Sequence, residues 1–393
     1  MLTSLALSPS FGFGDRLGLA TRGHIEALRS IQHVILPVFA QQSVRENART
    51  GRTPQQVIDD AKRVADSAKW DGPWGADADH LKSLDDLPSF VKAGYTFFTV
   101  DPGEYVDNTA DTAPISMLKE KAQATDWDQL SAFYMLENNE QAWGQFDADT
   151  LLRAQVKYSR AIQHVVGMFR RLSHLKDDFD FEVSVDETDS PTSPLEHYFI
   201  ASELTRLGVH FTSLAPRFIG RFEKGVDYIG DLDMLDAELA KHAAVTAHFG
   251  TYKLSLHSGS DKFSVYPLIT KHWSKRIHVK TAGTSYLEAL RVLTKYDPNL
   301  FQKIYTLARE KYETDRLTYH VSAKLDMLPV DVDLPLLLDD FHAREILHVT
   351  FGSALTAFGA EIKSTLVKHE DAYCEGLKIH FCRHLELLEK ADG

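Results

Sequence analysis

Short apolar runs alternate with amphipathic stretches along the chain from residue 10 to residue 295. The runs are rich in β-branched and aromatic residues and are bounded by turn-forming residues, as is typical of strands. They predict eight strands, at Ser10–Gly14, His33–Ala40, Trp70–His80, Tyr95–Val100, Phe181–Val185, Val209–Leu214, Tyr252–Leu256 and Arg276–Lys280. Helical patterns follow the strands, so the chain is organised as a series of strand–helix units.

Two of the predicted helices have recognisable first turns. Thr53 and Pro54 open one helix, because threonine is a favoured N-cap and proline a favoured first helical residue. Ser193 and Glu196 open another with the spacing of a capping box, in which each side chain bonds the backbone of the other.

Two regions stand outside the alternation. Residues 104–178 carry no strand signal and include an amphipathic helix at Ala154–His174, so they predict a helical insertion. Residues 298–393 are mostly helical, with two candidate short strands at Leu317–Val321 and Ile346–Val349. Eight units in series predict an α/β fold, a (β/α)8 TIM barrel over residues 1–297, with the C-terminal helical extension packed on the barrel.

The net charge of the chain argues against two classes of binding partner. The chain has 393 residues, with 43 Lys and Arg against 56 Asp and Glu, which gives a net charge of −13. This acidic balance argues against nucleic acid and anionic membranes as main partners, because both need a basic surface. The sequence also lacks the apolar run of about 20 residues that a membrane span requires.

Cysteine usage and the first residues predict the compartment. Cys374 and Cys382 match no zinc or redox spacing, which is typical of a reducing environment. Residues 1–8 lack the positive charge and long apolar stretch of a secretory signal. We therefore expect a soluble, cytoplasmic protein.

Polar residues follow every predicted strand. In a (β/α)8 barrel the active site lies at the carboxyl ends of the strands. Carboxylates and imidazoles stand at several of these ends, and both are ligands of divalent metals, so the pattern predicts a metal centre. The residues at the eight ends are Asp15, Arg16, Gln41, Gln42, Ser43, Asp77, Asp79, His80, Asp101, Asp186, Glu187, Arg217, His257, Asp261, Lys262, His278 and Lys280.

The alternation of polar and apolar residues predicts which side chains face the barrel interior. Lys253, Ser255 and His257 alternate with leucines, so His257 points inward. The same count places Asp186 inward, whereas Glu187 lies just past the strand, where the alternation no longer applies. Either carboxylate could be a ligand, and the other a base or a partner of a ligand.

Other candidate residues divide into structural and substrate-binding groups. We interpret His210, His320 and His348 as structural histidines. Basic residues at four strand ends predict an anionic substrate, since arginine binds a carboxylate through two hydrogen bonds. They are Arg16, Arg217, Lys262 and Lys280.

A glycine-rich stretch near the N-terminus approximates a dinucleotide-binding motif. Gly12 and Gly14 have the required spacing, but Leu17 stands where the third glycine should be. A bound nicotinamide cofactor is therefore disfavoured, and no cofactor-binding residues are predicted other than metal ligands.

Longer motifs lie at the same strand ends: Gly12–Thr21, Gln41–Glu46, Gly75–Lys82, Phe98–Pro102, Glu182–Thr188, Ser213–Arg217, Leu256–Phe263 and His278–Gly283. In order and in residue identity these motifs resemble the tagaturonate/fructuronate epimerase family over residues 10–295. The resemblance implies a (β/α)8 barrel, a divalent metal, and the interconversion of D-tagaturonate and D-fructuronate in hexuronate catabolism.

The implied reaction inverts one carbon that is not adjacent to the ketone. With the carboxylate carbon as C1 and the ketone at C5, the two sugar acids differ at C3. Retro-aldol cleavage of the C3–C4 bond followed by re-addition can invert C3, and so can deprotonation after the carbonyl is shifted by enediol steps. Transient oxidation by a nicotinamide cofactor is disfavoured by the broken motif. Both favoured routes need a Lewis acid and acid/base groups.

These requirements assign roles to the candidates. We expect Glu187, His257 and His278 to bind the metal, which the ligand types allow to be Mn, Fe, Co, Ni or Zn. We expect Asp101 and Asp186 to act as acid and base. The remaining candidates bind the sugar acid, with Asp77 or Asp79 as a further ligand or base: Asp15, Arg16, Gln42, Asp77, Asp79, His80, Arg217, Lys262 and Lys280.

Two other classes of function fit the same residues. One is a metal-dependent aldolase or ketose isomerase acting on a keto-sugar acid. The other is a sensor that binds a sugar acid without turnover. The sequence leaves open which metal is bound and whether the chain forms a homo-oligomer.

Overall fold

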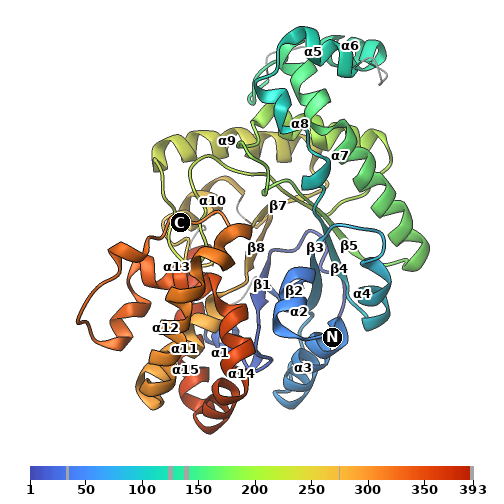
Figure 1. The fold of residues 1–393 in the computed structure, drawn as a ribbon. Helices are drawn as coiled ribbons and strands as arrows, with labels where there is room; N and C mark the ends of the chain where they lie inside the picture. Colours follow the sequence, from blue (N-terminus) through green and yellow to red (C-terminus); the bar gives the residue numbers. More distant parts are fainter. Residues whose placement is uncertain (32–34, 123–126, 137–140, 274, 390–393) are drawn as a thin grey trace.

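In the computed structural model, which describes residues 1–31, 35–122, 127–136, 141–273 and 275–389, eight parallel strands close into a barrel (Figure 1). Each strand pairs with the next, and β8 pairs with β1. The predicted (β/α)8 barrel is thus confirmed. The strands are β1 (Ser10–Gly14), β2 (Leu36–Ser43), β3 (Gly75–Leu81), β4 (Phe97–Val100), β5 (Asp180–Ser184), β6 (Ser213–Ala215), β7 (Lys253–Leu256) and β8 (Ile277–Thr281).

The observed strands fall within or beside the predicted runs, with shifts at the ends. The start of the second predicted strand, His33 and Val34, lies outside the described residues. The third strand begins at Gly75 rather than Trp70, and the backbone of Trp74, just before it, bonds to the N-terminal residues Met1 and Thr3. The predicted strand, Trp70–His80, thus includes Trp74, which pairs with the N-terminal residues and is not part of β3.

Helices surround the barrel and bury apolar side chains such as Phe39 and Tyr252 against the strands. Both predicted first turns are confirmed, since Thr53 and Ser193 each accept a hydrogen bond from the backbone three residues later in a capping box. The barrel helices are α1 (Thr21–Ser30), α2 (Val44–Thr50), α3 (Pro54–Ser67), α4 (Leu87–Ala93), α8 (Pro194–Arg206), α9 (Leu232–Phe249), α10 (Tyr266–Trp273) and α11 (Thr284–Tyr296).

Helices also fill the segment between β4 and β5, namely α5 (Ile115–Ala122), α6 (Trp127–Leu136) and α7 (Ala148–Leu175). The long helix α7 contains the predicted amphipathic helix and begins earlier, because Asp147 caps it. In Figure 1, α5 and α6 project from the barrel at one end of the molecule.

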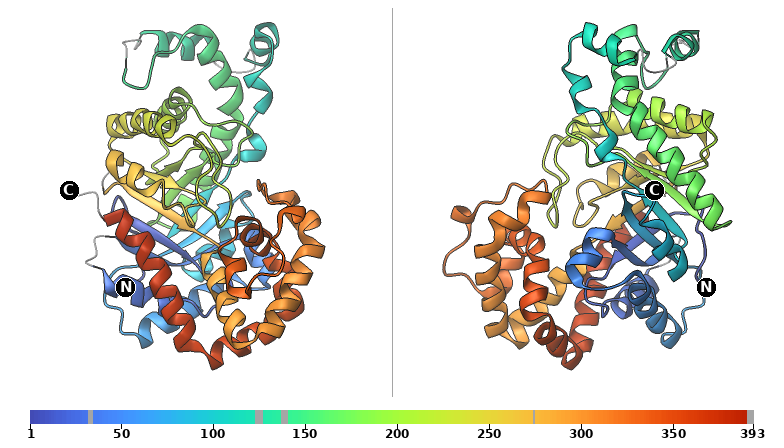
Figure 2. Two further views of the ribbon diagram at one scale, coloured as in Figure 1. Left: turned by 90° about the vertical axis from the view of Figure 1, so that its left-hand side faces the viewer. Right: turned by 45° about the vertical axis from the view of Figure 1, so that its right-hand side comes forward.

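The C-terminal helices pack on another side of the barrel, apart from α5 and α6 (Figure 2). They are α12 (Pro298–Asp315), α13 (Phe341–Val349), α14 (Phe351–Lys368) and α15 (Glu370–Glu389), and α15 packs against α1 and α11. The two predicted short strands are wrong: residues 316–318 form a 3-10 turn, and Ile346–Val349 belongs to α13. Short apolar runs fit either a strand or a buried helix face, and Asp340 decides here by capping α13.

None of the helices in the described part of the chain is both long and apolar enough to cross a membrane.

A pair of buried glutamates attaches the C-terminal part of the chain to the barrel. Glu223, in the loop after β6, accepts hydrogen bonds at 2.8 Å from the backbone and the hydroxyl of Ser322. Glu345, on α13, accepts from the backbone of Ser322 at 3.2 Å and of Ala323 at 2.8 Å. Burial and the neighbouring Glu223 carboxyl raise the pKa of Glu345 to about 8.

This raised pKa predicts a pH-dependent stability. The folded chain holds a proton on Glu345 that the unfolded chain loses above its ordinary pKa, so the free energy of unfolding falls as the pH rises from about 4.5 to about 8. Glu345 contributes at most about 1.4 kcal/mol per pH unit to this slope. We expect Glu345→Gln to flatten the slope, measured by denaturant unfolding at several pH values. Glu361→Gln, an exposed change on α14, is the control, and equal slopes in wild type and Glu345→Gln would contradict the prediction.

Candidate active site

The barrel interior contains a buried cation surrounded by carboxylates. The ammonium of Lys280, on β8, lies 2.7 Å from Asp77, 2.8 Å from Asp79 and 2.8 Å from Glu182. All four side chains are buried. Burial raises the pKa of Asp77 to about 7 despite the opposing attraction of Lys280. Burial disfavours the charged form of Glu182 as well, but Lys280 and His257 hold the pKa of Glu182 well below its ordinary value.

His257 connects this charged layer to the mouth of the barrel. Its Nε2 lies 2.7 Å from Glu182, and its Nδ1 lies 3.2 Å from Asp186. Burial favours the neutral imidazole, but the two carboxylates outweigh burial and raise the pKa of His257 to about 10. The inward direction that the alternation predicts for His257 and Asp186 therefore agrees with their contacts.

His80, Asp186 and His257, named the metal-type group below, are close enough together to hold a metal ion. One ligand atom from each of them lies within 4.8 Å of the others. His80 reaches this group from β3, where the pairing with β4 shifts register between Ala78 and Leu81. The backbone of His80 has a positive φ of 51°, an uncommon conformation for a residue with a side chain and one that is often found at functional sites.

The structure does not bring the three expected ligands together. His278 lies deeper in the barrel than His257, because it pairs in register with Ser255, two residues before His257. Its Nδ1 lies 2.9 Å from the hydroxyl of Ser10. Burial holds the pKa of His278 well below its ordinary value, so the ring is neutral.

Glu187 lies beside the metal-type group rather than in it. Its carboxylate oxygens are 3.5 Å from Arg45 and 3.8 Å from Lys82. Asp101, the other expected acid or base, is buried, and its Oδ2 lies 3.7 Å from Nδ1 of His80 and 3.2 Å from the ammonium of Lys82. Asp186, expected to be an acid or base, instead belongs to the metal-type group, and Glu187, expected to be a ligand, lies outside it.

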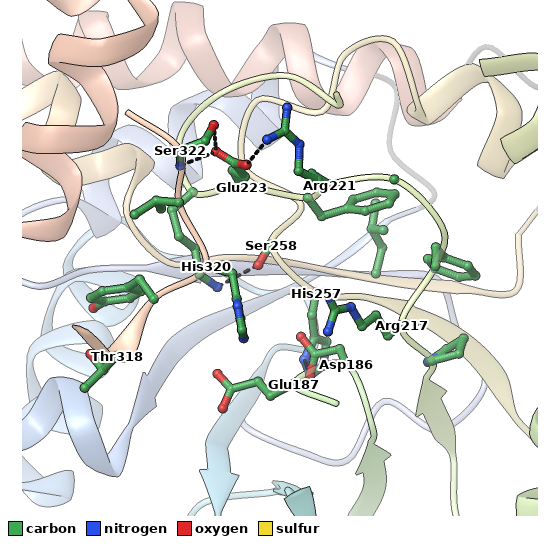
Figure 3. Close-up of a pocket in the computed structure, with 18 residues that line it drawn as sticks. Asp186, Glu187, Arg217, Arg221, Glu223, His257, Ser258, Thr318, His320 and Ser322 are labelled. Atoms are coloured by element: carbon green, nitrogen blue, oxygen red, sulfur yellow. Dashed lines mark hydrogen bonds and ion pairs between the residues drawn. The ribbon is translucent and has the colours of Figure 1, made fainter. Parts of the chain in front are cut away.

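A cavity of about 420 Å³ opens next to the group (Figure 3). Asp186, Glu187 and His257 line one side, and Arg217 lines it from the loop after β6. Among the described residues, the buried Nη1 of Arg217 has no hydrogen-bond partner, so its N–H groups can donate to an anionic ligand. A smaller cavity of about 30 Å³ shares His257 with the first and reaches Asp79, His80 and Lys280.

Four predicted substrate-binding residues have structural contacts instead. The carboxylate of Asp15 accepts hydrogen bonds from three backbone N–H groups of its own loop. Arg16 pairs with Glu46 at 2.9 Å and stacks on Phe351. Gln42 bonds to side chains outside the barrel interior, and Lys262 is buried and donates to three backbone carbonyls. None of the four lines either cavity.

The cavity also includes residues that the strand ends do not indicate. They come from the loops after β6 and β7 and from the segment between α12 and α13, and among them are Lys224, Ser258, Thr318, His320 and Ser322. Lys224 and Ser258 are joined by a hydrogen bond of 2.6 Å. The polar composition of the 217–224 loop is a signal that could have identified its residues, whereas nothing local connects residues 318–322 to the barrel mouth.

Comparisons with known proteins extend over almost the whole chain. Residues 3–388 match the family described as UxaE, tagaturonate epimerase. The tagaturonate/fructuronate epimerase of Thermotoga maritima is 44% identical over 393 residues, which cover 98% of this chain and 81% of that protein.

Solved structures agree with this result. A glycerol complex of the fructuronate-tagaturonate epimerase UxaE from Cohnella laeviribosi is 39% identical, with a TM-score of 0.93 over 99% of this chain and 83% of that one. The native crystal structure of that enzyme gives the same identity and TM-score over 98% and 83%. This chain therefore belongs to the tagaturonate epimerase family and is an isomerase of the epimerase type.

Proposed function

We propose that this chain interconverts D-tagaturonate and D-fructuronate by metal-dependent inversion of C3. The substrate assignment rests on one observation, the 44% identity to the tagaturonate/fructuronate epimerase of Thermotoga maritima over nearly the full chain. The metal-type group beside a cavity large enough for a small ligand is consistent with that assignment.

The described residues fit a divalent metal. His80, Asp186 and His257 offer imidazole and carboxylate donors that suit Mn, Fe, Co, Ni or Zn. Glu182 contacts the other nitrogen of His257, which is the arrangement that commonly orients a histidine ligand. A bound metal would supply Lewis-acid stabilisation of negative charge that develops on substrate oxygens.

The cavity provides groups for the rest of the sugar acid. The guanidinium of Arg217 has a free buried donor and matches a carboxylate. Lys224 and Ser258 lie on the same cavity and can bond hydroxyl groups. Substrate selection therefore depends on the loops after β6 and β7.

We assign proton transfer to Glu187, with Asp101 as the second carboxylate. In the retro-aldol route, Glu187 accepts the proton of the C3 hydroxyl, and the C3–C4 electron pair moves to C4 and the ketone oxygen. The products held in the site are a three-carbon enediolate and a three-carbon aldehyde acid. Rotation of the aldehyde and re-addition invert C3, and the proton returns to the new C3 oxygen. The C5 ketone activates this bond directly, so no shift of the carbonyl is needed.

The assay that tests the proposal is incubation of the metal-loaded protein with D-tagaturonate, followed by NMR. We expect D-fructuronate to form until the two sugar acids reach equilibrium. Accumulation of three-carbon fragments would indicate an aldolase instead, and binding without turnover would indicate a sensor.

Ligand variants distinguish the metal group from the proton-transfer group. We expect His80→Ala and Asp186→Ala to lose bound metal and to lower turnover by more than about 100-fold. Glu187→Gln keeps the size of the side chain and should retain metal while losing turnover. Metal content after dialysis, measured by mass spectrometry, checks this. Loss of metal in Glu187→Gln together with its retention in His80→Ala would favour the ligand set expected from the sequence.

Isotope labelling separates the two routes to inversion. Retro-aldol cleavage never breaks the C3–H bond, so product formed in D2O should carry no deuterium at C3. The deprotonation route removes this hydrogen and would place deuterium there. NMR of the isolated product decides between them, and deuterium at C3 would exclude the retro-aldol assignment.

A further inference from the structure

One wall of the cavity comes from outside the barrel. Residues Thr318–Ser322, named the wall segment below, follow α12 and line the cavity across from Asp186 and Glu187 (Figure 3). The catalytic side of the cavity is thus built by strand ends, and the facing side by the C-terminal part of the chain.

Side chains from α2, from the loop after β6 and from α13 hold the wall segment at its two ends. On α2, directly after β2, Arg45 donates to the carbonyl of Thr318 at 3.2 Å, and Arg49 donates to the hydroxyl of Tyr319 at 2.5 Å. At the other end, Glu223 and Glu345 bind the backbone of Ser322. Because α2 follows β2 and Glu223 follows β6, the wall segment crosses the mouth of the barrel.

His320 lies between these two sets of contacts. Its side chain is exposed and lines the cavity, and it forms no hydrogen bond or ion pair with the described residues. In Figure 3 its ring points toward Asp186 and Glu187. The interpretation of His320 as a structural histidine is therefore wrong, because such a residue is buried and bonded. His210 is exposed as well, so the same interpretation is wrong for His210.

We propose that His320 contacts the substrate, through a hydrogen bond to an oxygen on the part of the sugar acid that faces away from the metal-type group. This inference rests on the proposed function, which places the sugar acid in the cavity. An imidazole can donate or accept such a bond, and the fixed backbone on both sides limits the position of the ring. The wall segment thereby becomes part of the substrate site.

Substitutions at His320 test the proposal. We expect His320→Ala to raise KM for D-tagaturonate about tenfold, as loss of one hydrogen bond does. His320→Gln should recover part of this loss, because an amide can also donate and accept. His210→Ala, an exposed histidine away from the cavity, is the matched control. Bound metal and thermal stability should be unchanged in all three variants.

The outcomes separate this inference from the proposed function. Wild-type KM and kcat in His320→Ala, with wild type active, would overturn the contact and leave the function intact. Thermal stabilisation of each variant by D-tagaturonate provides a second measurement that does not need turnover. If wild type is stabilised but inactive, loss of stabilisation in His320→Ala supports the contact while the proposed function fails. If wild type is neither active nor stabilised, both fail together.

Discussion

The ion cluster around Lys280 is the interaction on which the arrangement of the site depends. Its ammonium lies within hydrogen-bonding distance of carboxyl groups from β3 and β5, and without it these buried acidic groups would have no cation to offset their charge. By fixing Glu182, Lys280 also fixes the side chain that contacts Nε2 of His257. His257 in turn faces Asp186 and His80. These contacts run from the centre of the barrel toward its mouth. The side chains of the metal-type group are therefore held in place by the ion cluster around Lys280.

Sequence patterns accounted for the barrel and for part of this layer. Strand–helix repetition determines the closed sheet, and the polar–apolar alternation assigns Asp186 and His257 to the interior. Alternation gives the face of a strand but not the depth of a residue in the barrel, which depends on the stagger between strands. His278 is therefore on the expected face of its strand, but it lies deeper in the barrel than His257, too deep to share a metal with it. The sequence assigns His80 to the substrate rather than to the metal, because the position of His80 depends on a register shift and a left-handed backbone that no local pattern reveals.

The contacts of the wall segment cannot be predicted from the local sequence, for a different reason. Residues 317–321 resemble a short strand by composition, yet the conformation of the wall segment is determined by side chains distant in sequence, Glu223 and Arg45 among them. Their partners are known only once the fold brings them together. The same holds for Lys262, whose charge suggests ligand binding but which bonds to the backbone of Glu223 and Val226.

The position of the wall segment has a consequence for biosynthesis. All eight strands precede residue 318, so during translation the barrel can close while the facing side of the cavity is still being made. Glu345, which anchors the segment, is added later still. Until then a nascent barrel presents its charged interior to water with only loop residues around it. Completion of the pocket is thus a late event in the maturation of the polypeptide, and it follows closure of the sheet rather than accompanying it.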